Sequence, residues 1–244
     1  MPTTPARMTA RSVVLSVLLG AHPASATPAE LLRFTADFGI KETAMRVALT
    51  RLVAAGDLVR SVDGYGLSER LLERQRRQDA ALDPQTKRWS GDWLAVVITS
   101  IGCDARTRAA LRAGLSDRRF AELREGFWMR PDNLDVELGD RLSSYTRLLI
   151  ARDEQPAELA AKLWDLDGWA RTGHELLTAM ADAEDVPARF VVAAAMVRHL
   201  RGDPVLPPEL LPPDWPGARI RSRYAEFAQE LASRRDAGQR AEVL

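Results

Sequence analysis

The residues between Lys41 and Tyr65 include basic and hydroxyl side chains at a spacing suited to contact with nucleic acid. In a helix expected from about Thr43 to Ala55, apolar residues recur at helical spacing and form one buried stripe. The opposite face then carries arginine and threonine side chains, which can contact phosphate oxygens and base edges when such a helix lies in the major groove. The candidate DNA-contacting residues are Lys41, Thr43, Arg46, Thr50, Arg51, Arg60 and Tyr65.

The elements that must position these side chains are indicated by local signals on both sides. Thr27 to Glu30 offer a capping box, with proline at the first helical position. Gly56 is placed to end the next helix, and Asp63-Gly64 is a strong hairpin signal. Upstream, apolar residues from Val13 to Leu18 supply the first helix of a three-helix core. This order predicts a winged helix-turn-helix over residues 9–67.

Two other interpretations of this segment stay open. The first is a helical pair whose charged face is merely solvated. The second is a secretory leader, because Arg7 and Arg11 precede the apolar run Val13 to Leu19 and Ala24-Ser25-Ala26 resembles a signal-peptidase site. We favour the winged helix, because the apolar run is short for a leader and its residues also complete the helical core.

The composition is that of a globular protein with more than one domain. The chain has 244 residues, of which 46% are hydrophobic, and its formal net charge is zero. The charge is divided unevenly, because residues 1–133 hold 20 basic and 15 acidic groups whereas residues 134–244 hold 14 and 19. This charge bias is consistent with a nucleic-acid-binding surface in the N-terminal part and a different function in the C-terminal part.

The few cysteine and histidine residues argue against a disulfide framework and against a zinc site. Cys103 is the only cysteine, and no Cys/His cluster has zinc spacing. We therefore expect a cytoplasmic protein that binds no metal. No apolar run approaches the length of a membrane span, so no membrane association is expected.

The rest of the chain is predicted to form a connecting helix and two further domains. Ser68 can cap a charged helix that Asp83-Pro84 ends, so residues 68–86 are a connecting helix and linker. Strand, helix and strand patterns over residues 87–152 suggest a small ferredoxin-like α+β domain, whose first strand runs from Trp93 to Ile101. Residues 156–235 are mostly helical. The predicted fold class is α+β, with a winged helix, a ferredoxin-like domain and a helical C-terminal domain.

Three sequence blocks together resemble the phenylacetic acid degradation repressor (PaaX) family. The first runs from Met45 to Leu52, the second is Trp89-Ser90-Gly91-Asp92-Trp93, and the third runs from Leu206 to Gly217, with Asp203-Pro204 ahead of it. The third block is the most specific, and the resemblance covers about residues 9 to 235.

This resemblance implies a dimeric transcriptional regulator, usually a repressor, whose partners are a double-stranded DNA operator and a small-molecule effector. Members of the family characteristically release DNA when they bind an aryl-coenzyme A thioester. The recognition helix of the family corresponds to residues 41–55 of this chain and its wing to residues 60–67. An acyl-CoA or aryl-CoA effector is therefore expected, and no cofactor.

Two enzymatic interpretations were weighed, and neither is supported by the residue types. The ferredoxin-like domain is similar to that of small CRISPR-associated nucleases, which need an acidic residue at the end of the first strand. Thr99, Ser100 and Ile101 occupy that end instead, and Asp104 comes later. A cysteine nucleophile would pair Cys103 with a histidine such as His174 or His199, but no local signature surrounds the cysteine. No catalytic residue is assigned.

The effector site cannot be assigned from the sequence. A coenzyme A thioester needs cationic groups for phosphate beside an apolar cavity for the acyl group. Five arginines qualify by type only: Arg106, Arg108, Arg112, Arg198 and Arg201. The proline-rich segment from Leu206 to Gly217 cannot be a regular helix, and we interpret it as a rigid loop with buried anchors that could also border the pocket.

A different class of function also stays open. The winged helix could mediate protein contact rather than DNA contact, in which case the chain would be a ligand-binding or partner-binding module. The salt dependence of binding separates the two, because DNA binding weakens steeply as salt rises.

Overall fold

The computed structural model describes residues 8–100 and 102–242, with side chains described up to residue 233, and these residues form two compact units. The first unit combines the chain up to Asp83 with residues 173–202 and with the chain from Pro216. The second unit holds residues 84–172 and 203–215. No described helix is long and apolar enough to cross a membrane.

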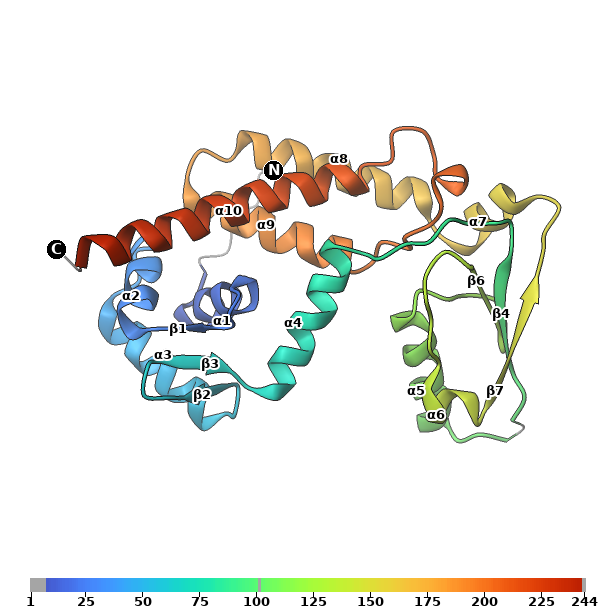
Figure 1. Ribbon diagram of the computed structural model, residues 1–244, viewed down its shortest axis with the longest axis horizontal. Coiled ribbons are helices and arrows are strands. Elements are labelled where there is room, and N and C mark those ends of the chain that lie inside the picture. Colours follow the sequence, from blue (N-terminus) through green and yellow to red (C-terminus); the bar gives the residue numbers. More distant parts are fainter. Residues whose placement is uncertain (1–7, 101, 243–244) are drawn as a thin grey trace. The chain divides into compact units, whose positions relative to one another are not determined.

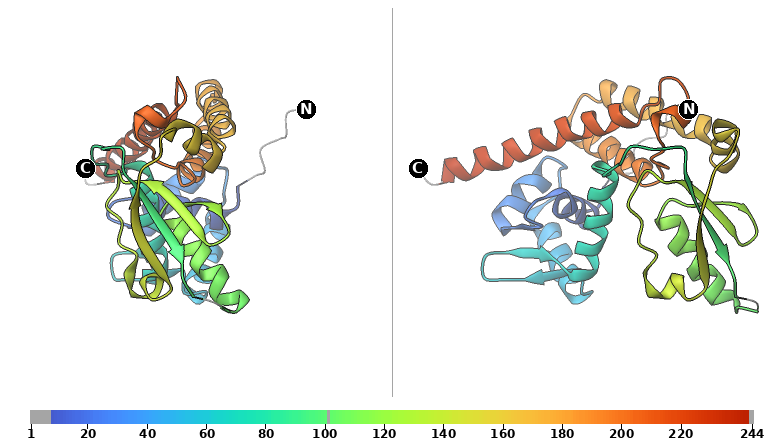
Figure 2. Two further views of the ribbon diagram at one scale, coloured as in Figure 1. Left: turned by 90° about the vertical axis from the view of Figure 1, so that its right-hand side faces the viewer. Right: turned by 45° about the vertical axis from the view of Figure 1, so that its right-hand side comes forward.

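The first unit begins with the expected winged-helix arrangement (Figure 1). Three antiparallel strands lie in the order β1-β3-β2, next to helices whose apolar faces share one core. Figure 2 shows the β2–β3 hairpin beside the helices of this unit. The elements are α1 (Ala10–Gly20), β1 (Ser25–Ala26), α2 (Pro28–Ala36), α3 (Glu42–Ala54), β2 (Leu58–Arg60), β3 (Tyr65–Leu67) and α4 (Glu69–Leu82).

Local chemistry sets the start of α2 and the hairpin turn as the sequence predicts, whereas the Ser68 side chain makes no capping hydrogen bond to α4. The Thr27 hydroxyl accepts a hydrogen bond from the Glu30 amide at 3.2 Å, and the Glu30 carboxylate accepts one from the Thr27 amide at 2.7 Å. Gly64 closes the hairpin with φ of 152°, and a Cβ there would lie 2.3 Å from the Ala26 carbonyl oxygen. Only glycine fits this turn, because β1 packs directly against it.

Strand β1 was not predicted, and it lies in the segment that the leader interpretation took as a cleavage site. Ala26 pairs with Tyr65 and is buried, while Val13 and Val14 of α1 are fully buried in the same unit. A two-residue strand has no alternating pattern, so only its pairing with β3 reveals it.

A buried carboxylate ties α1 and α4 to the start of the hairpin. The side chain of Asp57 is 5% exposed and accepts a hydrogen bond from Arg11 at 2.7 Å and another from Arg70. The Asp57 carbonyl also accepts from the amide of Ser68, which precedes α4. The acid thus has two cationic partners, as a buried charge requires.

Two helices from the end of the chain complete the first unit. They are α9 (Val186–Leu200) and α10 (Gly217–Glu242), and α8 (Leu166–Asp182) runs from the second unit into the first. The Phe190 ring of α9 packs edge-on against Phe38 at 5.1 Å between centroids and against Phe227 of α10 at 6.5 Å. Arg221 donates to the Ala81 carbonyl at 3.1 Å, which joins α10 to the end of α4.

The second unit has the ferredoxin-like topology that the sequence predicts. Its four strands lie in the order β5-β6-β4-β7, and all neighbours are antiparallel. With the helices this gives the chain order β4-α5-β5-β6-α6-β7, so the predicted α+β class is confirmed. The elements are β4 (Trp93–Ile98), α5 (Ala105–Asp117), β5 (Ala121–Arg124), β6 (Phe127–Pro131), α6 (Gly139–Ser143), β7 (Thr146–Ala151) and α7 (Pro156–Leu163).

Three details of this unit differ from the prediction. Strand β5 and helix α6 were not expected, because β5 has a register irregularity without a buried alternation and α6 has only five residues. The first strand ends at Ile98, three residues earlier than expected, where the chain turns away from the sheet. The expected end at Ile101 lies outside the described residues.

The proline-rich segment packs, together with α7, against one face of this sheet. Leu206 and Leu210 are buried against Trp93, and Trp215 stacks on Trp169 at 4.2 Å between ring centroids. The segment contains only a short 3-10 helix, η1 (Pro208–Leu210), as its prolines dictate. The expected irregular segment and its buried anchor at Leu210 are confirmed, whereas the other expected anchors, Leu211 and Trp215, are only partly buried. Helices α5 and α6 contribute to the apolar core that contains Leu94 and Val96 of the same sheet.

A buried arginine fastens this segment to the sheet. Arg130 of β6 is 1% exposed and donates to the carbonyls of Pro131 and Arg118 and to the side-chain oxygen of Asn133, at 2.8 to 3.0 Å. Asn133 in turn donates to the Val205 carbonyl at 2.9 Å. Burial lowers the pKa of Arg130 to about 10, which still leaves the guanidinium charged at neutral pH.

Candidate nucleic-acid interface

Helix α3 divides its residues between a buried and an exposed face, as its pattern predicts. The buried side chains are Met45, Ala48, Leu49 and Leu52. The exposed side chains include four of the seven candidates, namely Thr43, Arg46, Thr50 and Arg51. Lys41 is also exposed, at the N-cap position of the helix. The tertiary packing therefore leaves these side chains accessible to a partner.

Two of the candidates on α3 already have partners within the helix. The Arg46 Nε donates to the Glu42 carboxylate at 2.8 Å, and the Thr50 hydroxyl donates to the Arg46 carbonyl at 3.1 Å. The Arg46–Glu42 pair is exposed on both sides, and such a pair contributes only about 0–1 kcal/mol. A phosphate group could therefore displace Glu42, whereas Thr50 keeps only its acceptor lone pairs for a partner.

Arg51 and Lys41 differ from Arg46 in this respect. Among the side chains that the structure describes, neither has an ion-pair or hydrogen-bond partner. Arg51 lies in the last turn of α3 and Lys41 just before its first turn. These two cations require no rearrangement before they can bind an anion.

The hairpin presents one of its two candidates and partly buries the other. Arg60 is exposed, and it pairs across the ladder with Tyr65, whose ring packs against the apolar core of the unit. Tyr65 therefore has a packing role, and only its exposed part is available to a partner.

The seven candidate residues do not include an apolar component of this surface. Val62 at the hairpin tip is fully exposed, Val59 on β2 is 58% exposed, and Val47 on α3 is half exposed. Aliphatic side chains at a DNA interface can contact thymine methyl groups. The exposure of Val62 could have been anticipated, because it directly precedes the Asp63-Gly64 turn, where a side chain has no core to enter.

The five arginines considered for an effector fall into two groups. Arg106, Arg108 and Arg112 lie on α5 of the second unit, where Arg108 donates to the Cys103 carbonyl at 2.7 Å and Arg112 pairs with Glu122. Arg198 and Arg201 lie at the end of α9 in the first unit, and both line a cavity. Arg108 and Arg112 thus have internal partners, whereas Arg198 and Arg201 lie beside an empty space.

The cysteine and the two histidines considered for nucleophilic catalysis lie in different units. Cys103 belongs to the second unit and is 3.1 Å from the Ser100 hydroxyl, whereas His174 and His199 belong to the first. His174 is 3.3 Å from the Arg219 guanidinium. Cys103 and His174 therefore each have a local partner within their own unit.

Comparison with known proteins places this architecture in one family. Residues 9–71 match the family model described as PaaX-like protein, and residues 164–239 match the model described as PaaX-like protein C-terminal domain. A solved structure, of uncharacterized protein Rv0674 from Mycobacterium tuberculosis, is 66% identical in sequence, with a TM-score of 0.86. That match covers 95% of this chain and 99% of the other. No curated protein matches the chain.

The two family models fall on the winged helix and on the C-terminal helices, and the third sequence block lies within the second match. The resemblance drawn from the three sequence blocks is therefore confirmed by independent parts of the chain. The chain belongs to the PaaX-like family of transcriptional regulators.

Proposed function

We propose that this regulator is a homodimeric repressor that binds operator DNA through α3 and the β2–β3 hairpin. The exposed cationic face of α3 carries the proposal, because Arg51 and Lys41 have no ion-pair partner among the described side chains. Arg46 and Thr43 add donors, and Val47 supplies an apolar contact at the centre of the same face. The effector would be an acyl- or aryl-coenzyme A thioester that releases the operator.

The edge strand β7 supports the dimer. Leu148, Leu149 and Ile150 are 44%, 53% and 70% exposed, although they are consecutive large apolar residues in a strand. Among the described strands, β7 has a neighbour on one side only, so its other edge offers backbone groups that no described strand pairs. An exposed apolar edge is suited to pairing with another strand, and we assign the equivalent strand of a second copy.

Charge supports self-pairing of β7. An antiparallel pair centred on Ile150 would set Arg147 of each copy opposite Asp153 of the other. Such an arrangement obeys twofold symmetry, because the same patch serves both subunits. Ile150→Asp should then convert the dimer to a monomer, and an unchanged mass in sedimentation would contradict this interface.

The DNA contact is tested on duplexes selected by this protein from a pool of random sequence. Two half-sites about one helical turn apart are expected, because a dimer places two recognition helices in successive major grooves. Arg51→Ala should then weaken binding about tenfold or more, as loss of one charge-assisted contact does. Arg77→Ala on α4 is the matched control, because Arg77 is exposed and pairs with Glu73 outside the candidate surface. Equal binding by both variants would contradict the assignment.

Protein contact rather than DNA contact is the second candidate, and the exposed Val47, Val59 and Val62 favour it. Aliphatic side chains that gather on a surface are typical of a protein interface. DNA binding must lose affinity steeply between low and physiological salt, because phosphate contacts release counterions. Failure to select any duplex at low salt would favour the protein-binding alternative.

A further inference from the structure

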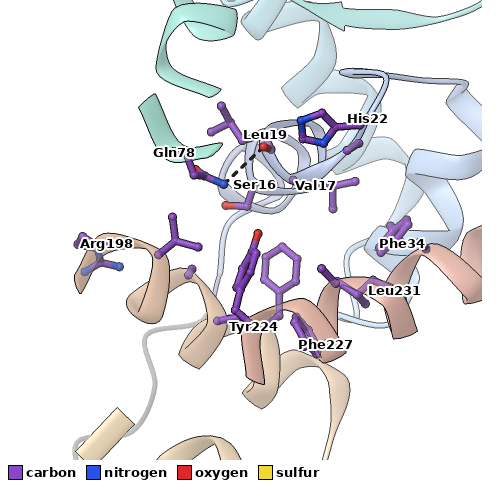
Figure 3. Close-up of a pocket in the computed structure, with 18 of the residues that line it drawn as sticks. Ser16, Val17, Leu19, His22, Phe34, Gln78, Arg198, Tyr224, Phe227 and Leu231 are labelled. Atoms are coloured by element: carbon purple, nitrogen blue, oxygen red, sulfur yellow. Dashed lines mark hydrogen bonds between the residues drawn. The ribbon is translucent and has the colours of Figure 1, made fainter. Parts of the chain in front are cut away.

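The first unit contains a partly open cavity of about 510 Å³ between the winged helix and the C-terminal helices (Figure 3). Its walls come from the end of α1 and the loop after it, from α2, α4, α9 and α10. A volume of this size is typical of sites for small organic ligands. All of the described lining residues belong to the same compact unit.

The cavity exists because short side chains on two helices face longer ones on the winged helix. Helix α9 contributes Ala193 and Ala194, and α10 contributes Ala228 and Ala232. A protein interior is normally close-packed, so alanines on two adjoining helices leave volume that no other described side chain of the unit fills.

One end of the cavity is apolar. Phe34, Phe227 and Leu231 lie together at this end in Figure 3, and Val17 lies nearby on α1. The Phe190 ring, which packs edge-on against Phe227, closes the wall on the α9 side. An aromatic ring or an aliphatic chain would be desolvated favourably at this end.

The other end is polar and cationic. Arg198 and Gln78 lie there in Figure 3, and Arg74 and Arg201 also line the cavity. These three arginines have no ion-pair or hydrogen-bond partner among the side chains that the structure describes, in contrast to Arg76 on the same helix α4. No acidic residue is among the described lining residues.

Between the two ends, Tyr224 offers a hydroxyl group. Its side chain shares a hydrogen bond with Gln78, and burial raises its pKa, so the hydroxyl remains protonated and can donate. Gln78 also donates to the Leu19 carbonyl at 3.5 Å, which links the polar end to the C-terminus of α1.

We propose that this cavity binds an amphipathic organic anion, with the apolar body against Phe34 and Phe227 and the anionic head near Arg74, Arg198 and Arg201. A guanidinium pairs with carboxylate or phosphate through two parallel hydrogen bonds, so the site discriminates against neutral analogues of the same ligand. The location of the cavity beside the winged helix would let its ligand regulate DNA binding, and this part of the proposal rests on the proposed function. The occupant touches α1 and α4, which share a core with α3, so it can favour one packing of the winged helix over another.

Binding is tested first without DNA. The fluorescent anion anilinonaphthalene sulfonate has an aromatic body and a charged head, and N-phenyl-naphthylamine is its uncharged counterpart. The wild-type chain should bind one molecule of the anion, saturably. Arg198→Ala and Arg74→Ala should each weaken anion binding about tenfold while the neutral dye binds as before. Arg77→Ala, close to Arg74 on α4 but outside the cavity, should change neither.

Ala194→Phe should fill the cavity and abolish binding of both dyes, with circular dichroism as the check on folding. If this variant does not fold, the arginine variants alone decide. The proposal is overturned if the anion does not bind, or if its affinity is unchanged in Arg74→Ala and Arg198→Ala. Octanoate and octanoyl-coenzyme A then compete with the dye. Displacement by either supports the site and identifies the head group, and displacement by neither contradicts it.

The cavity and the DNA surface can be separated by a pair of variants. Arg198→Ala should lose anion binding and keep affinity for the selected duplex, whereas Arg51→Ala should do the reverse. If the wild-type chain binds the dye but no DNA, the cavity stands and the repressor assignment fails. If it binds DNA and no dye, the cavity proposal fails alone.

Discussion

The two units stabilise a buried charge in different ways. The first buries the Asp57 carboxylate but leaves its partners Arg11 and Arg70 exposed, with 55% and 70% of their side chains accessible. The second buries Arg130 completely and satisfies it with neutral oxygens. Loss of the buried group should therefore cost more in the second unit, because its partners cannot turn to water.

The tryptophans allow the two units to be followed separately. All six tryptophans of the chain lie in the second unit. Tryptophan fluorescence therefore reports unfolding of that unit, and far-ultraviolet circular dichroism reports the helices of both.

The largest effect is expected for Arg130→Ala. The substitution leaves the carbonyls of Arg118 and Pro131 and the Asn133 oxygen without their donor, and it opens space next to Phe120. We expect a loss of about 3–5 kcal/mol in the free energy of unfolding, measured by urea denaturation and tryptophan fluorescence. Arg130→Lys should lose less, because it keeps the charge but not the planar fork. A loss below about 1 kcal/mol for alanine would show that the network contributes little.

A smaller effect is expected for Asp57→Ala. The two arginines that it releases can be hydrated where they are, so the loss should be about 2 kcal/mol. This loss of stability should appear when unfolding is followed by circular dichroism. The midpoint of unfolding followed by tryptophan fluorescence should stay unchanged. Asp63→Ala is the control, because this acid is exposed on the hairpin. A tryptophan midpoint that falls with Asp57→Ala would mean that the two units unfold together.

The smallest effect is expected for Glu42→Gln, which frees an exposed charge rather than a buried one. Stability should change by less than about 0.5 kcal/mol, because the Arg46–Glu42 pair is exposed. Affinity for the selected duplex should rise about threefold, since Arg46 no longer has to leave a carboxylate. The same change in an Arg46→Ala background separates this release from simple removal of a negative charge. An equal rise in both backgrounds would show that the gain comes from removal of the negative charge and not from release of Arg46.

Several features of the fold followed from local rules. The capping box at Thr27 and the hairpin at Gly64 depend on residues close in sequence, so the pattern identifies them. The apolar stripe of α3 fixes which of its residues are exposed, and four of the candidate contacts follow from it. The ferredoxin-like topology was inferred although β5 and α6 were missed, because the apolar patterns of β4, β6 and β7 were recognised in the sequence.

Other features depend on pairing between distant parts of the chain. Strand β1 exists because it pairs with β3, some forty residues later. The ion pair of Arg46 and the packing of Tyr65 limit how far these two side chains are available to a partner. Neither contact can be predicted from the residue types alone.

The sequence by itself determined the class of the protein, because caps, turns and helical periodicity act over a few residues and the three family blocks are contiguous. Only the tertiary structure decided which arginines lack partners and where a cavity lies. Arg74 and Arg198 come from helices more than a hundred residues apart in sequence, and α9 and α10 belong to the same unit as the winged helix although most of the second unit lies between them in sequence. The physical reason is that close packing is non-local: alanines become a cavity wall only when distant helices meet.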